Sequence, residues 1–196
     1  MTYEEIRGRL SRKRVGIAGC GGLGSNCAIA LARVGMGTLV IVDFDCLSVS
    51  NLNRQYYFRD QVGMKKVEAL ADNILRIDPT IRVEKHAVRI TATNFTGLFA
   101  GCDVIVEAFD LAEEKEMLIT SALTHFPTIP LVVGSGMAGW GNNAAIHCRR
   151  LGNIYVCGDE TSEISASMPP LAPRVGMVAN MQANVVMDIL LNSVQL

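Results

Sequence analysis

Long hydrophobic runs are absent from this sequence of 196 residues, although hydrophobic residues make up 49% of it and the mean hydropathy is +0.28. Its apolar stretches are broken by glycine or charged residues well before the roughly 18 residues that a membrane span needs. Residues 1–14 are rich in charge and contain no apolar core of a signal peptide. We therefore expect a cytoplasmic protein without a membrane partner.

An excess of charge of one sign is also missing. The chain has 18 lysines and arginines against 19 aspartates and glutamates, and no long basic run. A nucleic-acid partner requires a basic surface, so we expect none. The length suits one domain with one hydrophobic core, which we predict to span residues 1–196.

Paired cysteine motifs are a third absence. The 6 cysteines contain no CxxC spacing, and the 3 histidines lie far apart in the sequence. In a cytoplasmic chain this pattern indicates reduced, mostly buried thiols. It argues against a disulfide framework, and we predict no zinc site.

The sequence does contain alternating short β-branched segments and longer helical patterns, which are typical of an α/β fold with a mostly parallel sheet. We predict strands at residues 14–19, 38–45, 81–88, 103–108 and 129–133, and helices at 25–34, 65–77, 93–99 and 112–124. Residues 144–149 and 154–157 are predicted to form an antiparallel extension, and 158–173 an exposed loop. A long apolar C-terminal helix, 174–194, should be either central or packed on another subunit. The predicted fold is doubly wound and Rossmann-like.

A glycine-rich turn, GCGGLGS at residues 19–25, joins the first predicted strand to the first predicted helix. It matches GxGxxG, in which glycines let backbone NH groups approach phosphate oxygens and the helix N-terminus supplies partial positive charge. Asp43 follows 24 residues after Gly19, at the end of the next predicted strand. A carboxylate there can accept hydrogen bonds from ribose hydroxyls, so the two features predict a nucleotide site.

Polar residues beyond Asp43 help to choose between nucleotides. An NAD-dependent oxidoreductase would give no role to Asn51, Arg54, Lys66 or Asp110. It would also need a side chain placed to exchange a proton with a carbinol, and this sequence offers no obvious one. ATP explains more of these residues, because a triphosphate needs cations and a magnesium ion, for which Arg54, Lys66 and Asp110 are suitable residue types. We therefore favour ATP with Mg²⁺. A nicotinamide oxidoreductase and a non-catalytic nucleotide-binding scaffold remain as alternatives.

Four segments in this order, namely GCGGLG, DFD with SNLNRQ, GMKKVEAL and EAFD, resemble the ThiF/MoeB family, relatives of the ubiquitin-activating enzymes. The short length and the segments YVCGD and LAPRVGM look most like the compact ThiF group of thiamine biosynthesis. The resemblance implies ATP-dependent adenylation of the C-terminal glycine of a small ubiquitin-like sulfur-carrier protein, ThiS-like and ending in Gly-Gly, by a homodimer. A different carrier, a small molecule or a tRNA base is the alternative substrate.

The resemblance also implies roles for individual residues, of which Arg54, Lys66 and Asp110 are the catalytic candidates. Asp110 would work with magnesium. Attack of a carboxylate on the α-phosphorus needs positioning and charge neutralisation rather than proton transfer, which suits a site without a histidine base. The ATP-contacting set comprises Gly19, Gly21, Gly22, Gly24, Asp43, Asn51, Arg54 and Lys66.

Some residues keep two interpretations. Asp45 either contacts the ligand or caps the turn that follows it, and Gln55 either supports the loop or contacts the ligand. Cys157 is the best candidate for a sulfur or thioester nucleophile, although a packed strand cysteine is the stronger interpretation. The family also carries an N-terminal arginine that reaches the partner subunit's ATP site, for which the candidates are Arg7, Arg9 and Arg12.

Overall fold

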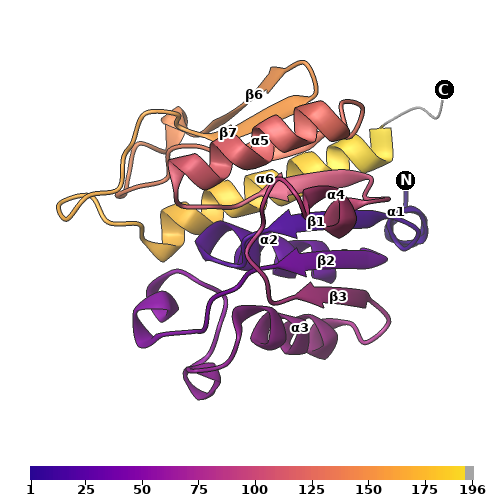
Figure 1. Ribbon diagram of the computed structural model, residues 1–196, viewed down its shortest axis with the longest axis horizontal. Helices are drawn as coiled ribbons and strands as arrows, with labels where there is room; N and C mark the ends of the chain where they lie inside the picture. The colour runs from indigo at the N-terminus through magenta and orange to yellow at the C-terminus, as the bar shows by residue number, and fades with distance from the viewer. Residues whose placement is uncertain (193–196) are drawn as a thin grey trace.

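The computed structural model describes residues 1–192. Its seven strands form one sheet in the order β3-β2-β1-β4-β5-β7-β6, with helices on both faces (Figure 1). The strands are β1 (Arg14–Ala18), β2 (Thr38–Val42), β3 (Arg82–His86), β4 (Val104–Glu107), β5 (Leu131–Gly134), β6 (His147–Leu151) and β7 (Ile154–Gly158). All neighbours pair in parallel except β6 and β7, which form the predicted antiparallel extension.

Two helical layers cover the sheet (Figure 1). The helices are α1 (Tyr3–Leu10), α2 (Gly22–Arg33), α3 (Lys66–Ile77), α4 (Phe95–Phe99), α5 (Ala112–His125) and α6 (Ala172–Asn192). One apolar cluster joins the sheet to α2, α3 and α6, and a second joins the other face to α4 and α5. Of the described helices, none has the length and apolarity needed to cross a membrane.

The apolar helix α6 is central in the fold. It packs along α2, and Val178, Ala179 and Val186 on this face are fully buried. Strand β4 is buried on both faces, as its continuous apolar sequence predicts, with Val104 fully buried in one apolar cluster and Ile105 buried in the other. The centre of the molecule is therefore a sheet enclosed between helices, with its loops at the two ends of the strands.

The predicted α/β fold and the order of its predicted elements are confirmed, and the differences are one additional helix and the ends of several elements. Helix α1 was not predicted; a capping box between Thr2 and Glu5 begins it. Strand β6 begins at His147 rather than residue 144, because residues 143–145 form a 3-10 turn. Helix α6 begins two residues earlier than predicted, with Pro173 in its first turn, where a missing NH costs nothing. Residues 193–194 of the predicted helix lie outside the described residues.

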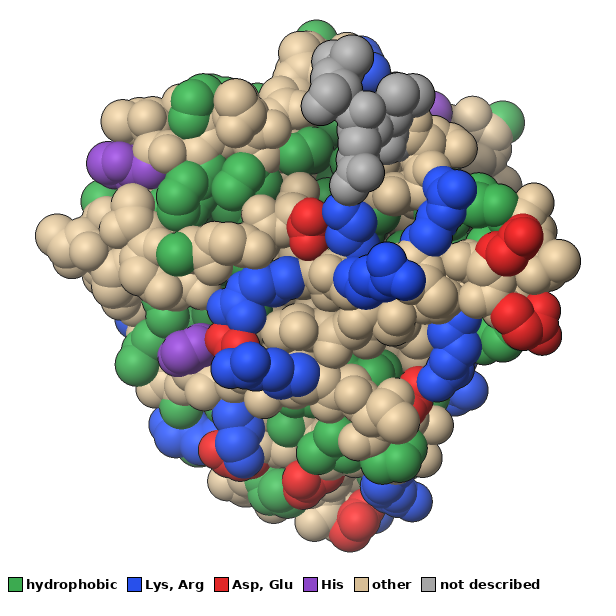
Figure 2. Space-filling model, turned by 90° about the vertical axis from the view of Figure 1, so that its right-hand side faces the viewer, with side chains coloured by type: hydrophobic (Ala, Val, Ile, Leu, Met, Phe, Trp, Pro, Cys, Tyr) green, Lys and Arg blue, Asp and Glu red, His purple; other side chains and the backbone are tan. Residues whose placement is uncertain are grey.

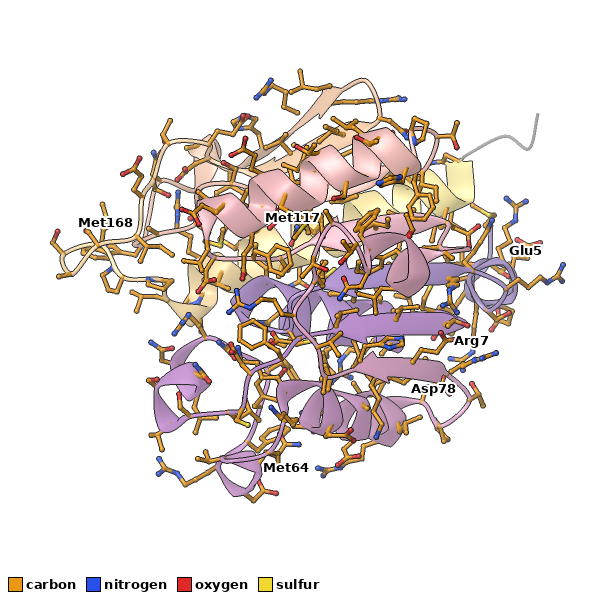
Figure 3. The ribbon with its side chains drawn as sticks, in the orientation of Figure 1. Glu5, Arg7, Met64, Asp78, Met117 and Met168 are labelled. Atoms are coloured by element: carbon orange, nitrogen blue, oxygen red, sulfur yellow. The ribbon has the colours of Figure 1, made fainter. Side chains whose placement is uncertain are left out.

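The end of the molecule where the strands begin carries the N-terminal arginines, and Figure 2 faces it. Arg7 forms an ion pair with the buried Asp78, and Figure 3 shows the two side by side, opposite the loop that carries Met168. Arg9 Nη1 donates to the Leu191 carbonyl at 3.4 Å, which ties α1 to α6. These arginines therefore lie at the opposite end of the sheet from the loops that follow its strands.

Candidate nucleotide-binding site

A cleft of about 770 Å³ opens where the parallel strands end. Its walls come from the loops after β1, β2, β3, β4 and β5, and from residues of the segment 162–170 that precedes α6. Ligands of open α/β sheets collect at this edge, because the strand order reverses there between β1 and β4. The fold therefore brings residues far apart in the sequence into one concave site.

The glycine-rich turn forms the floor of the cleft. Gly19 has a positive φ of 95°, and a Cβ there would lie 2.9 Å from the Ala108 carbonyl oxygen. A Cβ on Gly24 would lie only 1.8 Å from the Gly19 carbonyl oxygen, so Gly24 lets α2 approach β1 closely. Gly21 is the N-cap of α2 and has no side chain to occupy the helix NH groups. Gly21 and Gly22 line the cleft, whereas Gly24 lies behind it.

Asp43 and Lys66 form a buried charged pair beside this turn. The Asp43 carboxylate accepts hydrogen bonds from the Cys20 NH at 2.7 Å and the Asp45 NH at 2.8 Å. Lys66 Nζ lies 3.7 Å from Asp43 Oδ2 and 2.6 Å from Asp45 Oδ2. Asp43 therefore ties the β1 and β2 loops together, and Asp45 holds the Lys66 ammonium against the cleft wall.

The segment 51–56 is pinned onto helix α2. Asn26 Nδ2 donates to the Arg54 carbonyl at 2.9 Å, and Ser25 Oγ accepts from the Tyr56 NH at 2.9 Å. The Arg54 guanidinium donates to Asn53 Oδ1 at 2.7 Å, and its aliphatic stem lies over Gly22. Arg54 thus lines the cleft.

Asn51 is placed differently from Arg54. Its Oδ1 accepts from the Ser48 NH at 3.0 Å, and the residue lies outside the set that lines the cleft. Asn51 therefore shapes the turn that presents Arg54 and lies outside the cleft lining.

An aromatic and apolar corner of the cleft lies beside Asp43. The Arg89 guanidinium carbon lies 4.1 Å from the centre of the Phe44 ring, and Arg89 also pairs with Glu114. Val88 and Ile90 line the same corner. A flat base fits between apolar and aromatic groups, so this corner can hold the base of a nucleotide.

The β4 side contributes Asp110, which is exposed at the mouth of the cleft. Within residues 1–192 its carboxylate has no hydrogen-bond or ion-pair partner. Lys115 Nζ, on the same side, donates to the Gly134 carbonyl at 2.8 Å and pairs with the fully buried Glu107. Burial raises the pKa of Glu107, and the Lys115 ammonium opposes that rise.

Lys115 was missed in the sequence. It lies five positions after Asp110 and in the first turns of α5, where a lysine is indistinguishable from an ordinary exposed helix residue. Its buried partner Glu107 is the last residue of an otherwise apolar strand, and this carboxylate was the feature of the sequence that could have pointed to Lys115. A buried carboxylate requires a counter-charge, and the nearest cation along the chain is Lys115.

Cys157 lies in the core rather than in the cleft. Its side chain is fully buried, and Cys148 is its cross-strand neighbour in the β6–β7 pair. Burial and the neighbouring Cys148 thiol raise the pKa of Cys157 well above its ordinary value. The nucleophile role of Cys157 stays a prediction, one that this environment does not favour.

The site thus unites most of the predicted residues. Those that line the cleft are Gly19, Gly21, Gly22, Asp43, Asp45, Arg54, Lys66 and Asp110. Among the residues described, no cluster of three or more histidine, cysteine or acidic side chains could hold a metal alone. A magnesium ion carried by a nucleotide needs less, because phosphates and waters supply most of its ligands.

A glycine-rich turn at a helix N-terminus, a carboxylate at the end of the next strand and a crevice at the switch point are together typical of nucleotide-binding proteins of the doubly wound class. The chain belongs to the ThiF family, whose model matches residues 2–195. The predicted resemblance to ThiF/MoeB proteins is therefore confirmed.

Its relatives are named for adenylyl transfer and carrier activation. The SAMP-activating enzyme E1 of Haloferax volcanii is 39% identical over 132 residues, which are 67% of this chain and 48% of that protein. The molybdopterin-synthase adenylyltransferase of Salmonella typhimurium is 31% identical over 179 residues, 89% of this chain and 71% of that protein. The chain thus spans about half the length of the archaeal relative.

Solved structures share the fold. The tRNA N6-threonylcarbamoyladenosine dehydratase TcdA of E. coli, in complex with AMP, has a TM-score of 0.87 and 22% identity, over 95% of this chain and 89% of that one. TcdA in complex with ATP gives a TM-score of 0.82 at 25% identity, over 94% and 89%. The first of these likenesses supports the fold alone.

Proposed function

We propose that this protein transfers AMP from ATP to the C-terminal carboxylate of a small ubiquitin-like sulfur-carrier protein ending in Gly-Gly, with release of pyrophosphate. One observation carries the proposal. A single cleft joins a phosphate-facing glycine turn to Arg54, Lys66 and Asp110, and none of its described lining residues is a histidine or cysteine. Adenylation needs this combination, because its barrier is lowered by in-line positioning and charge neutralisation.

Each side chain would contribute one task. Asp43 would hold the ribose, and the NH groups at the start of α2 would bind phosphate oxygens. Arg54 and Lys66 would neutralise the triphosphate, and Asp110, which has a free carboxylate, would hold Mg²⁺ together with the phosphates. The magnesium ion would supply further charge neutralisation at the leaving pyrophosphate.

The carrier's extended tail would enter beside the ends of β5 and β7. Gly134 and Gly136 line the cleft there, together with Ser162 and Ile164 of the covering segment. We propose a ThiS-type carrier of thiazole synthesis, a cytoplasmic setting and a homodimer in which an N-terminal arginine reaches the partner's cleft.

Carrier-dependent exchange of labelled pyrophosphate into ATP tests the proposed function. We expect exchange with ThiS-type carriers ending in Gly-Gly, and its loss in Arg54→Ala and Asp110→Ala. Exchange with other carriers only would replace the thiamine role, and ATP turnover driven by tRNA instead would place the protein with the tRNA-modifying relatives. Tight NADH binding without ATP binding would overturn the proposal.

A further inference from the structure

Gln55 is a buried polar residue on the cleft wall whose side chain has no partner in the described chain. It is 8% exposed, and its Oε1 is shielded from solvent without accepting a hydrogen bond from any of residues 1–192. Its backbone is fixed, because its NH donates to the Asn51 carbonyl and its carbonyl accepts from the Tyr57 NH, both at 2.9 Å. The loop backbone therefore fixes the position of the Gln55 side-chain carboxamide, and this carboxamide forms no hydrogen bond with the loop.

The next glutamine in the chain shows what a structural role looks like. Gln61 is 6% exposed, and its Nε2 donates to Asn73 Oδ1 at 2.9 Å while its Oε1 accepts from the Phe58 NH at 3.0 Å. Buried amides are normally satisfied in this way, since an unpaired one loses its hydrogen bonds to water. Gln182 also has an unpaired Oε1, but its Nε2 bonds the Glu107 carbonyl and it lies outside the cleft lining. Gln55 is the unpaired amide that a ligand can reach.

The position of Gln55 indicates which part of a nucleotide it would meet. A Cβ on Gly21 would lie 3.8 Å from Gln55 Nε2, so the amide faces the N-cap of α2. The preceding residue, Cys20, is bonded to the candidate ribose carboxylate Asp43. In a nucleotide the α-phosphate follows the ribose directly. Gln55 lies beside Gly21, next to the Cys20 that is hydrogen-bonded to Asp43, so a nucleotide whose ribose is held by Asp43 would place its α-phosphate near Gln55.

We infer that the Gln55 carboxamide donates a hydrogen bond to a non-bridging oxygen of the α-phosphate and holds this phosphorus in line with the attacking carboxylate. This inference rests on the proposed function. The Gln55 NH₂ group faces Gly21 of the cleft lining, and phosphate oxygens bound there offer only acceptors. A neutral donor suits this place because it orients the α-phosphate without pairing with the incoming carboxylate.

Two variants of Gln55 and a matched control test the role. We expect Gln55→Leu to lower kcat/KM for ATP about tenfold, and Gln55→Glu, which adds negative charge beside the phosphate, about a hundredfold. Gln55→Leu should keep the Tm of the wild type, because the side chain has no structural partner, whereas Gln55→Glu buries an unpaired carboxylate and should also lower the Tm. Gln61→Leu should instead lower the Tm and leave KM for ATP unchanged in the folded protein.

Phosphorothioate nucleotides then separate α-phosphate contact from a general effect on the cleft. Sulfur accepts hydrogen bonds weakly, so kcat/KM of the wild type should differ between the two diastereomers of adenosine 5′-O-(1-thiotriphosphate). Gln55→Leu should reduce the ratio of these two kcat/KM values at least about threefold. An unchanged ratio would overturn the inference while leaving the proposed function intact. If wild type shows no exchange with any carrier, the same ratio measured as Kd still decides the role of Gln55.

Discussion

Arg174 Nη2 donates a hydrogen bond to Asp159 Oδ2 at 2.5 Å, and both side chains are buried. The other Asp159 oxygen accepts from the NH groups of Thr161 at 2.9 Å and Ser162 at 2.8 Å, and Arg174 Nη1 donates to the Gly141 carbonyl. Arg174 at the start of α6 therefore holds both the turn at residues 159–162 and the backbone at Gly141. It links the packing of α6 to the shape of the proposed entrance for a carrier tail.

Replacing Arg174 by Met should lower the free energy of unfolding by about 3–5 kcal/mol, because Asp159 would remain buried without its counter-charge. Chemical denaturation at neutral pH measures this loss. Arg149→Met is the matched control, since Arg149 pairs with Glu160 at the surface and its loss should change stability little. An equal loss of unfolding free energy in the two variants would contradict a stabilising role for the buried Arg174–Asp159 ion pair.

The Arg174→Met difference should also depend on pH. Burial alone would raise the pKa of Asp159, but the NH groups of Ser162 and Thr161 together with Arg174 outweigh it and hold the pKa well below its ordinary value. A lowered pKa in the folded state stabilises the protein above the unfolded pKa of about 3.9, and this stabilisation is lost as pH falls toward the folded pKa. The difference between variant and wild type should therefore shrink below about pH 4.

Two glycines of one turn should respond in opposite ways to substitution. Gly24→Ala places a Cβ 1.8 Å from the Gly19 carbonyl oxygen, so we expect a loss of about 3 kcal/mol or more of stability. Gly21→Ala meets no atom closer than 3.8 Å, so it should change stability by at most about 1 kcal/mol. Its methyl group projects at the helix N-cap, and we expect ATP affinity to fall at least about tenfold. Thermal unfolding measures the loss of stability in Gly24→Ala, and calorimetric titration with ATP measures the loss of affinity in Gly21→Ala. Similar changes of stability and affinity in both variants would contradict a packing role for Gly24 and a ligand-facing role for Gly21.

Much of the fold could be predicted from the sequence, because alternation of apolar strands and amphipathic helices is a local pattern. The cleft residues that follow strand ends, such as Asp43 and Asp110, could also be placed, since all parallel strands end at one edge. Gly24 and Asn51 show the limit. Their motif positions are clear, but whether they face a ligand depends on packing against Gly19 and on the turn at Ser48.

Long-range pairs were beyond the reach of the sequence. Arg174 lies in the quoted segment LAPRVGM, yet nothing local indicates that its partner is Asp159, 15 positions away across a loop. Gln55 similarly allowed two readings, and only the unpaired side chain distinguishes them. The role of each residue follows from which distant groups the fold places beside it: a buried carboxylate beside Arg174, and no hydrogen-bond partner beside the Gln55 side chain.

Asp45 and Lys66 make a prediction about phosphate binding. Lys66→Met removes a cation from the cleft and should weaken ATP binding at least about tenfold. Asp45→Asn should leave ATP affinity unchanged or increase it a few-fold, because Lys66 Nζ is paired with Asp45 Oδ2 at 2.6 Å and this pairing competes with phosphate. Titration of both variants with ATP measures the contrast. A similar loss in Asp45→Asn would show instead that Asp45 contacts the ligand.

Asp110 should control the magnesium dependence of exchange. Asp110→Asn keeps the size of the side chain but removes the charge, so we expect pyrophosphate exchange to fall about a hundredfold and the Mg²⁺ concentration for half activity to rise. Stability should not change, since Asp110 is exposed. Glu113→Gln is the control, as this carboxylate is exposed in the first turn of α5 and lies outside the cleft lining. Equal Mg²⁺ curves for all three proteins would exclude Asp110 as the magnesium-holding group.

Cys157 should be chemically silent in the folded protein. It is fully buried, and its raised pKa keeps the thiol protonated at neutral pH, whereas Cys46 and Cys148 are exposed. Iodoacetamide followed by mass spectrometry should label Cys46 and Cys148 first and Cys157 only after unfolding. Cys157→Ala should retain carrier-dependent pyrophosphate exchange, because adenylation uses no thiol. A folded Cys157→Ala protein that exchanges pyrophosphate but no longer forms a covalent carrier adduct, seen with wild type, would restore Cys157 as the nucleophile of a later step.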